Sequence, residues 1–493
     1  MLRKIRIFLA VIVFVPLTLL FLDFTGTIRL WFGFLAKVQF LPALLASNFI
    51  IVLLLVAVTL IFGRIYCSVI CPLGIMQDII ARMGRIGRKR KLHYGYSPAM
   101  NLLRYAVLAL FVVMMLFGMA GIPALIAPYS SYGRIASELF APVYAWLNNI
   151  LAYFSGRLES YAFYSSDVWL KSGITLLVAA VSFAVIAVLA WRNGRTYCNT
   201  ICPVGTVLGF LSRFSIFKIR ISGDKCVGCK LCSRSCKASC IDIKNKKVDY
   251  SRCVACMDCI DNCVRGAISY SALRPVRETS LKQPDGGRRN FLSLSTLMIA
   301  SAATASAKEK GGNVIAALER KKPYVRETPV VPPGAVGAKH FAEHCTACQL
   351  CVQSCTNDVL RPSGSIYHFM QPSMSYERGF CRPECTACSE VCPSGAILPV
   401  SREKKSSIQI GHAVWIRDNC IVITDGVHCG NCSRHCPSGA ITMVKENPSD
   451  PHSARVPAVN EQRCIGCGAC EYVCPARPFA AIHVEGHQMH KII

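Results

Sequence analysis

The sequence predicts a mixed architecture, in which an α-helical membrane bundle precedes two small α+β modules built around metal. Three observations point to it. The 493-residue chain is 53% hydrophobic and only 17% charged, against roughly 25% charged residues in an average soluble domain. The apolar excess lies in the first 200 residues, and most of the 29 cysteines follow it. This composition excludes a simple soluble enzyme, a disordered tail and a small disulfide-stapled secreted domain.

Four apolar runs predict membrane spans at residues 7–22, 44–62, 102–120 and 174–191, each near the roughly 20 residues that a spanning helix needs. The first is expected to be an uncleaved anchor, because no small-x-small cleavage site follows it. Residues 30–45, interrupted by Lys37 and Pro42, are expected to be interfacial or re-entrant. We divide the chain into a membrane domain (1–220), a two-cluster module (221–272), a linker with a fifth span (273–339, span 288–307) and a four-cluster module (340–493).

The distribution of Lys and Arg predicts the orientation of the membrane domain. Basic residues gather at 1–6, 64–104 and 192–213, which all fall on one side of a four-span arrangement. That side is expected to be cytoplasmic by the positive-inside rule, and residues 121–171 then lie outside. The same rule accounts for much of the formal charge of +27, so we expect no nucleic-acid partner.

Twenty-four cysteines fall into six groups of four, and four of these groups have the spacing C-x2-C-x2-C-x3-C. This is the bacterial ferredoxin pattern, in which three close thiolates bind one [4Fe–4S] cluster and the fourth binds the neighbouring cluster. The four groups are Cys226, Cys229, Cys232, Cys236; Cys253, Cys256, Cys259, Cys263; Cys345, Cys348, Cys351, Cys355; and Cys464, Cys467, Cys470, Cys474.

The other two groups keep the end of the motif but lengthen its first gap. They are Cys381, Cys385, Cys388, Cys392 and Cys420, Cys429, Cys432, Cys436, and both end in Cys-Pro-Ser-Gly-Ala-Ile. A displaced first ligand still suits a cluster, because ligands need only converge in space; a zinc site is the alternative. We therefore expect 24 iron ligands and six [4Fe–4S] clusters, and we expect Cys240 to serve packing alone.

The remaining four cysteines belong to an internal repeat of the form Gly-Arg-x-Tyr-Cys-x3-Cys-Pro-x-Gly. Its copies span residues 63–74 and 194–205 and contain Cys67, Cys71, Cys198 and Cys202. Cys-x3-Cys on a helix places both thiols on one face. Together they could bind a metal or cluster, or act as two dithiols, and we predict a redox or metal site. The alternative is two structural motifs in which small cysteines pack under a Pro-terminated helix.

Residues 288–307 resemble a twin-arginine export signal placed inside the chain. Arg288-Arg289-Asn290-Phe291-Leu292 leads into an uncharged run that ends in Ala305-Ser306-Ala307. The alternative is a basic linker followed by an Ala/Ser-rich loop. Export would leave the first module cytoplasmic and the second periplasmic, joined by a fifth span or separated by cleavage near Ala307.

Taken together, residues 1–270 resemble the NapH-type membrane ferredoxins, and residues 288–493 resemble the exported NapG or MauM type, so the chain looks like a natural fusion. The resemblance implies a quinol dehydrogenase of the bacterial inner membrane that passes electrons to a periplasmic cytochrome or reductase. Lys237, Val264 and Thr356 stand where the family pattern has Pro after a ligand. No C-x-x-C-H motif occurs, so c-type haem must come from a partner, and no nicotinamide motif follows a strand.

The mechanism expected from this resemblance begins with quinol oxidation in the membrane domain and continues with single electrons passing through the clusters. Gln77, Asp78, His93 and Tyr96 lie near the first repeat, but a solvated loop is the expected role of all four. The roughly 30 Å hydrocarbon core requires a relay between the modules: the repeat thiols, the quinone or a partner's cofactor. Two alternatives stay open, a reductant or assembly factor for maturation of a metalloenzyme and a scaffold without turnover.

Overall fold

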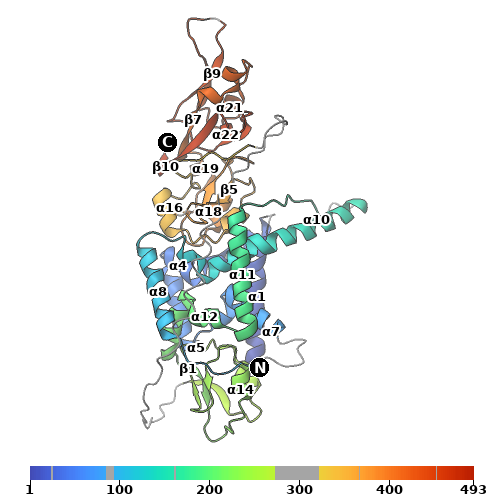
Figure 1. Ribbon diagram of the computed structural model, residues 1–493, viewed down its shortest axis with the longest axis vertical. Coiled ribbons are helices and arrows are strands. Elements are labelled where there is room, and N and C mark those ends of the chain that lie inside the picture. Colours follow the sequence, from blue (N-terminus) through green and yellow to red (C-terminus); the bar gives the residue numbers. More distant parts are fainter. Residues whose placement is uncertain (24–25, 85–93, 160–162, 273–320, 366, 451) are drawn as a thin grey trace, which may run out of the picture.

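The computed structural model describes residues 1–23, 26–84, 94–159, 163–272, 321–365, 367–450 and 452–493. These parts form an elongated molecule, with a layer of helices in the middle and one cysteine-rich module at each end (Figure 1). The N-terminus lies near the first module (residues 217–272), and the C-terminus lies in the second module (residues 321–493).

Four apolar helices run along the long axis of the molecule: α1 (Leu2–Leu22), α5 (Phe49–Phe62), α8 (Asn101–Leu116) and α11 (Gly173–Asn193). Helices α1 and α11 have 21 residues each and are long and apolar enough to cross a membrane. Helices α5 and α8 have 14 and 16 residues. At about 1.5 Å per residue, α8 extends for about 24 Å, short of a hydrocarbon core of about 30 Å. Two of the four expected spans are therefore supported by length, and the four-span bundle is not confirmed.

Local capping explains why α5 is shorter than the apolar run that contains it. The Asn48 side chain accepts a hydrogen bond from the backbone N–H of Ile51 (3.3 Å) and so fixes the start of the helix. Gly63, with a φ of 73°, ends it. Residues 44–48, which the sequence assigned to this span, instead complete a short preceding helix and a turn.

Further helices lie between and beside these four. The interrupted segment 30–45 forms three of them, and its last helix is buried from Phe40 to Ala43. Helix α10, with 17 residues, extends sideways from the helical layer near the second module (Figure 1). These further helices are α2 (Thr27–Phe32), α3 (Phe34–Lys37), α4 (Phe40–Leu45), α6 (Tyr66–Val69), α7 (Pro72–Met83), η1 (Pro123–Leu125), α9 (Pro128–Ile135), η2 (Ala136–Phe140), α10 (Ala141–Arg157), α12 (Thr196–Thr200), α13 (Pro203–Leu211) and η3 (Ser212–Phe214).

Both modules combine short helices with two-stranded antiparallel sheets, as the α+β prediction requires. Among the described residues of the first module the pairs are β1 (Phe217–Ile221) with β4 (Ile268–Ala272) and β2 (Ile241–Asp242) with β3 (Lys247–Val248). Its helices are α14 (Leu231–Ser235) and α15 (Asp258–Asp261).

The second module repeats this plan on a larger scale. Its strand pairs are β5 (Leu360–Pro362) with β6 (Pro372–Met374), β7 (Ile408–Trp415) with β10 (Ile482–Ile492), and β8 (Ile441–Lys445) with β9 (Arg455–Val459). Its helices are α16 (Ala338–His344), α17 (Leu350–Gln353), α18 (Ala387–Val391), α19 (Arg402–Lys405), η4 (Arg417–Asn419), α20 (Ile421–Thr424), α21 (Asn431–Arg434) and α22 (Ala469–Val473).

The second module docks on the helical layer through buried contacts. Arg134, in the fully buried helix α9, donates hydrogen bonds to the carbonyls of Ala124 (3.0 Å) and Ala347 (3.5 Å). The guanidinium groups of Arg361 and Arg378 each contact the ring of Trp169, in the loop before α11, at 4.7 Å from its centroid. The predicted twin-arginine segment and fifth span, residues 288–307, lie outside the described residues, as does His93.

Candidate iron–sulfur centres

The structure gathers the 24 motif cysteines into six sets of four, which we number from the first module outward. The members of each set line one hollow or lie within electrostatic reach of one another. They are site 1 (Cys226, Cys229, Cys232, Cys263), site 2 (Cys236, Cys253, Cys256, Cys259), site 3 (Cys345, Cys348, Cys351, Cys392), site 4 (Cys355, Cys381, Cys385, Cys388), site 5 (Cys436, Cys464, Cys467, Cys470) and site 6 (Cys420, Cys429, Cys432, Cys474).

In every one of the six sites the fourth cysteine comes from the neighbouring run. This exchange is the arrangement that the ferredoxin spacing indicates, and it extends to the two groups with lengthened gaps. In site 6 the displaced Cys420 lines the same hollow as Cys429 and Cys432. The sequence left the pairing in the second module open, and the structure assigns it.

A recurrent backbone turn brings the first three cysteines of a site together. The residue after the second cysteine adopts a left-handed conformation in Lys230 (φ 62°), Met257 (φ 62°) and Gln349 (φ 66°), and Gly468 takes the same place in the last run. Each of these residues caps a helix of four or five residues that carries the third cysteine. The turn folds the C-x2-C-x2-C segment around one point.

The sites offer a donor set that suits a cluster. Backbone N–H groups donate hydrogen bonds of 3.3–3.4 Å to the fourth sulfur in sites 1, 3, 5 and 6, and such bonds tune cluster potentials. Burial raises the pKa of Cys232 and of Cys348 to about 11 each, so these thiols release a proton when metal binds. Within the described residues, no group of three or more His, Cys, Asp or Glu side chains is arranged to hold a single metal ion.

Cys240 packs as expected, and it also contacts a candidate ligand. Its side chain is 1% exposed, and its Sγ atom lies 3.5 Å from Sγ of Cys236 in site 2. The equivalent place in the sister run is held by Ala267, whose N–H contacts Cys263. Site 2 therefore has the S–H group of Cys240 beside its fourth ligand, where site 1 has the methyl group of Ala267.

The thiols of Cys67, Cys71, Cys198 and Cys202, which we call the central thiol set, are buried together between the two modules (Figure 1, around α12). Each pair comes from a helix break followed by a Pro-initiated helix, α7 or α13. The two repeats thus bring their four thiols together, while the predicted redox or metal role of these thiols stays a prediction. The N–H of Gly205 donates to Cys202 Sγ (3.3 Å), and Gln77 Nε2 lies 3.4 Å from Cys198 Sγ.

The arginine and the last glycine of each repeat interlock with the other copy. Arg64 donates to the carbonyl of Cys198 (3.2 Å), and Arg195 donates in the same way to the carbonyl of Cys67. A Cβ atom at Gly74 or Gly205 would collide with the carbonyl oxygen of the first cysteine of its own repeat and would crowd the arginine of the other copy. The repeat therefore needs arginine and glycine for a geometric reason.

The expectation that Gln77 and Asp78 lie in a solvated loop is wrong, because both are buried on α7. Asp78 contacts three cations: Arg6 (3.0 Å), Arg195 (2.8 Å) and Lys237 (3.2 Å). Burial alone would raise the pKa of Asp78, but these cations hold it well below its usual range. Its partners lie far away in the sequence, so no local pattern predicts them. Tyr96 is half-exposed and lies 5.7 Å from the guanidinium of Arg252.

Buried side chains connect the central thiol set to a module on either side. Toward site 2, Arg6 donates to the carbonyls of Ser68 (3.4 Å) and Cys256 (3.5 Å). Toward site 3, Tyr66 lies within electrostatic reach of the central thiols, and Tyr129 lies within reach of both Tyr66 and Cys348. Both tyrosines are buried.

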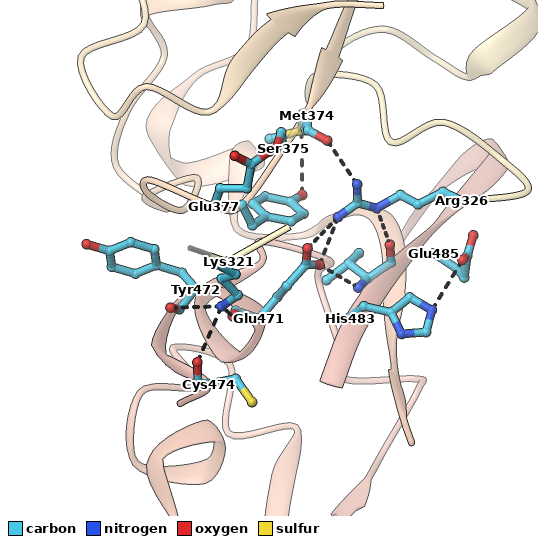
Figure 2. A network of polar contacts seen from close by, with 12 residues as sticks. Lys321, Arg326, Met374, Ser375, Glu377, Glu471, Tyr472, Cys474, His483 and Glu485 are labelled. Atoms are coloured by element: carbon cyan, nitrogen blue, oxygen red, sulfur yellow. Dashed lines mark hydrogen bonds and ion pairs between the residues drawn. The ribbon is translucent and has the colours of Figure 1, made fainter. Parts of the chain in front are cut away.

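In the second module the sites continue away from the helical layer. The N–H of Cys381 in site 4 donates to the carbonyl of Cys467 in site 5 (2.9 Å). Figure 2 shows the polar network behind sites 5 and 6, in which Arg326 binds both carboxylate oxygens of Glu471 (2.7 and 2.8 Å). Lys321 donates there to the carbonyl of Cys474 (3.4 Å).

Comparison with protein families finds two matches. A family described as a 4Fe-4S binding domain matches residues 44–93 and 175–222, the two segments that contain the central thiols. A 4Fe-4S dicluster domain matches residues 427–477, which include seven of the eight cysteines of sites 5 and 6. For these sites the dicluster match favours iron–sulfur clusters over the zinc alternative.

Three curated relatives are also similar. YccM of Escherichia coli (strain K12), named for a role in electron transport, is 23% identical over 238 residues, 48% of this chain and 58% of YccM. The ferredoxin-type protein NapF of the same organism is 30% identical over 157 residues, 32% of this chain and 86% of NapF. The methylamine utilization ferredoxin-type protein MauM of Methylobacillus flagellatus is 30% identical over 168 residues, 32% of this chain and 69% of MauM. No solved structure matches the chain. The chain is therefore an iron–sulfur electron-transfer protein and belongs to the ferredoxin-type family that includes NapF and MauM.

Proposed function

We propose that this chain is a membrane-bound quinol dehydrogenase that distributes electrons among six [4Fe–4S] clusters and delivers them to a redox partner at the far end of its second module. The observation that carries the proposal is a row of seven thiol sets along one chain. Sites 1 and 2 lie at one end, the central thiol set follows, and sites 3 to 6 lie at the other end.

The clusters, when bound, would accept and release single electrons with little movement of their ligands. The chain's own residues supply the rest. Cysteine thiols hold the cofactors, backbone N–H groups stabilise the sulfur atoms, and the buried pair Arg64 and Gln77 contacts sulfur atoms of the central thiol set. That set is proposed as a redox site, either two dithiols or the ligands of a further cluster, that links the two modules.

The proposed location is a bacterial inner membrane, with the N-terminus and first module cytoplasmic and the second module periplasmic. The modules lie at opposite ends of the helical layer (Figure 1), and α1 and α11 are long enough to cross the membrane between them. Helix α10 carries exposed apolar side chains, among them Val143, Trp146 and Leu151, which suits a helix lying in the membrane interface. A periplasmic cytochrome or reductase is the proposed acceptor.

The test is anaerobic mixing of the full-length protein in lipid vesicles with menaquinol, followed by spin counting of reduced clusters at low temperature. Signals are assigned with variants that lack one ligand of site 2 or of site 5. We expect reduction of both modules in the native chain and in Thr200→Ala, a control in the same short helix as Cys198.

In Cys67→Ser and Cys198→Ser, we expect reduction to be confined to the module on the side where quinol binds. Clusters that dithionite reduces but quinol does not would refute the proposed function. That outcome would favour the second candidate, a reductant for metalloenzyme maturation, for which the central thiol set resembles a pair of dithiols.

A further inference from the structure

A cavity of about 570 Å³ lies where the helical layer meets the second module. Its walls come from the end of α1, from η2 and the first turn of α10, from the loop before α11, and from the segment 353–358 that contains Cys355 of site 4. The volume falls within the roughly 300–1,000 Å³ of typical small-molecule sites.

One wall of the cavity carries a buried acid. Glu138, in η2, is 6% exposed, and its carboxyl group makes no hydrogen bond or ion pair with the described part of the chain. Burial raises the pKa of Glu138 to about 7, although Lys171 opposes the shift. The carboxyl group can therefore exist in both protonation states near neutral pH.

Two other polar side chains of the cavity, Lys171 and Gln353, hold the second module against the helical layer. Lys171 donates to the carbonyl of Val352 (3.3 Å) and to the side chain of Gln353. Gln353 in turn donates to the carbonyl of Ser137 (3.1 Å), beside Glu138. These bonds hold the Cys355 segment against the wall that carries the acid.

The surroundings of the cavity are apolar and exposed. Val143 and Leu147 on α10 and Ile174 and Leu177 on α11 are at least half exposed, so a lipophilic ligand can approach from the membrane. Among the described residues that line the cavity, two are cations, Arg29 and Lys171. Four are carboxylates: Asp23, Glu138, Asp167 and Asp358. Arg29 is moreover paired with Glu390 (3.4 Å). This balance disfavours an anionic lipid head group and favours a neutral one.

We infer that this cavity binds the head group of an isoprenoid quinol beside site 4, with Glu138 as the first acceptor of its protons. The inference rests on the proposed function and deepens it by placing the substrate. The quinol loses two O–H protons and two electrons to become a quinone. One proton passes to the Glu138 carboxylate and the other to water, and the two electrons enter two oxidised clusters of the second module, one each.

Binding is tested without turnover by titrating the full-length protein with the menaquinol analogue 2-heptyl-4-hydroxyquinoline N-oxide, whose fluorescence is quenched when it binds. Ala145→Trp fills the cavity from α10, and we expect it to weaken binding at least about tenfold, since a filled pocket excludes the ring. Ala152→Trp on the same helix lies outside the cavity and serves as the matched control. Iron content and reduction by dithionite verify that both variants fold.

Glu138→Gln is expected to keep analogue binding and to slow menaquinol-driven reduction of the second module about 100-fold, a typical effect of losing a general base. Glu138→Asp should restore part of the rate, and Glu403→Gln, an exposed carboxylate of the second module, should leave it unchanged. An unchanged rate in Glu138→Gln, or unchanged binding in Ala145→Trp, overturns the inference. Displacement of the analogue by phosphatidylglycerol at low salt would assign the cavity to a lipid head group and also overturn it.

A variant of the central thiol set, Cys67→Ser, distinguishes a failure of this inference from a failure of the proposed function. In Cys67→Ser, quinol should still reduce sites 3 to 6 and should no longer reduce sites 1 and 2. Reduction of sites 1 and 2 alone would leave the proposed function standing and refute this placement of the substrate. Analogue binding blocked by Ala145→Trp, with no cluster reduction by menaquinol in the native chain, would refute the proposed function and leave the binding site standing.

Discussion

The ion pair between Arg326 and Glu471 offers the sharpest test of how the second module is held together. Glu471 lies on α22 between Cys470 of site 5 and Cys474 of site 6. Its carboxylate accepts two hydrogen bonds from Arg326 (2.7 and 2.8 Å) and one from the N–H of Val484 (2.9 Å) (Figure 2). Both charged side chains are less than 10% exposed.

The burial of both charges determines how much the free energy of unfolding should change when either is removed. Arg326→Met leaves a buried carboxylate without its cation, and Glu471→Leu leaves a buried guanidinium without its anion, so each should cost about 3–5 kcal/mol. The double variant removes both charges and leaves the N–H and the carbonyl of Val484 without their side-chain partners, at about 1–3 kcal/mol for each group. Each of these losses also occurs in one of the single variants, so the summed single effects should still exceed the double effect, by about 3 kcal/mol.

The assay is native-state hydrogen exchange of the full-length protein, read as the free energy of local opening of α22 and β10. The exposed pair Arg417 and Glu446 is the matched control, because its side chains are 58% and 31% exposed. Glu446→Leu should leave exchange in α22 unchanged. Single effects that simply add up to the double effect would refute the claim that a buried charge pair stabilises this helix.

Three further predictions follow from the geometry of the sites. Cys355→Ser should remove the cluster of site 4, about four iron ions per chain, and Cys392→Ser should instead remove that of site 3; iron analysis showing the reverse would refute the exchanged pairing. Asp78→Asn leaves three buried cations without their anion and should destabilise the docked first module by about 3–5 kcal/mol, whereas the exposed Asp224→Asn should not; equal hydrogen exchange in both variants would contradict this. Burial and the neighbouring imidazole of His487 lower the pKa of His490 to about 4, below its value of about 6.5 in the unfolded chain. Neutral His490 therefore contributes fully to the free energy of unfolding above pH 6.5, and this contribution is lost as the pH falls toward 4. The melting temperature should fall between pH 7 and pH 5, and less so in His490→Gln; an identical decline in both would refute the assignment.

The grouping of the cysteines could be read from the sequence because ligand spacing is local. A C-x2-C-x2-C segment folds around one point through a single left-handed residue such as Lys230, and its fourth cysteine follows the rule for paired clusters. The environment of the central thiol set was not predictable in this way. Asp78 is buried because Arg6, Arg195 and Lys237 converge on it from distant positions, and no periodicity records such a meeting.

The cavity beside site 4 escaped prediction for the same reason. Its walls combine α1, η2, α10, the loop before α11 and the Cys355 segment, and only folding brings these pieces together. Glu138 belongs to no recognised motif, and nothing in the sequence around it predicts that its side chain is buried. Hydropathy alone does not register the cap at Asn48, so the apolar run 44–62 gave no sign that α5 begins only at Phe49.

The two Cys-x3-Cys-Pro repeats are best understood as halves of one site. Each arginine binds a cysteine carbonyl of the other copy, so neither half completes its polar contacts alone. The halves nevertheless differ in what they connect. Arg64 reaches Asn199 (3.0 Å) and Ser251 (2.9 Å), whereas Arg195 reaches Asp78 (2.8 Å) and through it Lys237, next to Cys236 of site 2. Both arginines contact residues of the first module directly or through Asp78, whereas Tyr66 and Tyr129 lie between the central thiols and Cys348 of the second module. The central thiol set is therefore connected to a different module on each side, as a link between the modules requires.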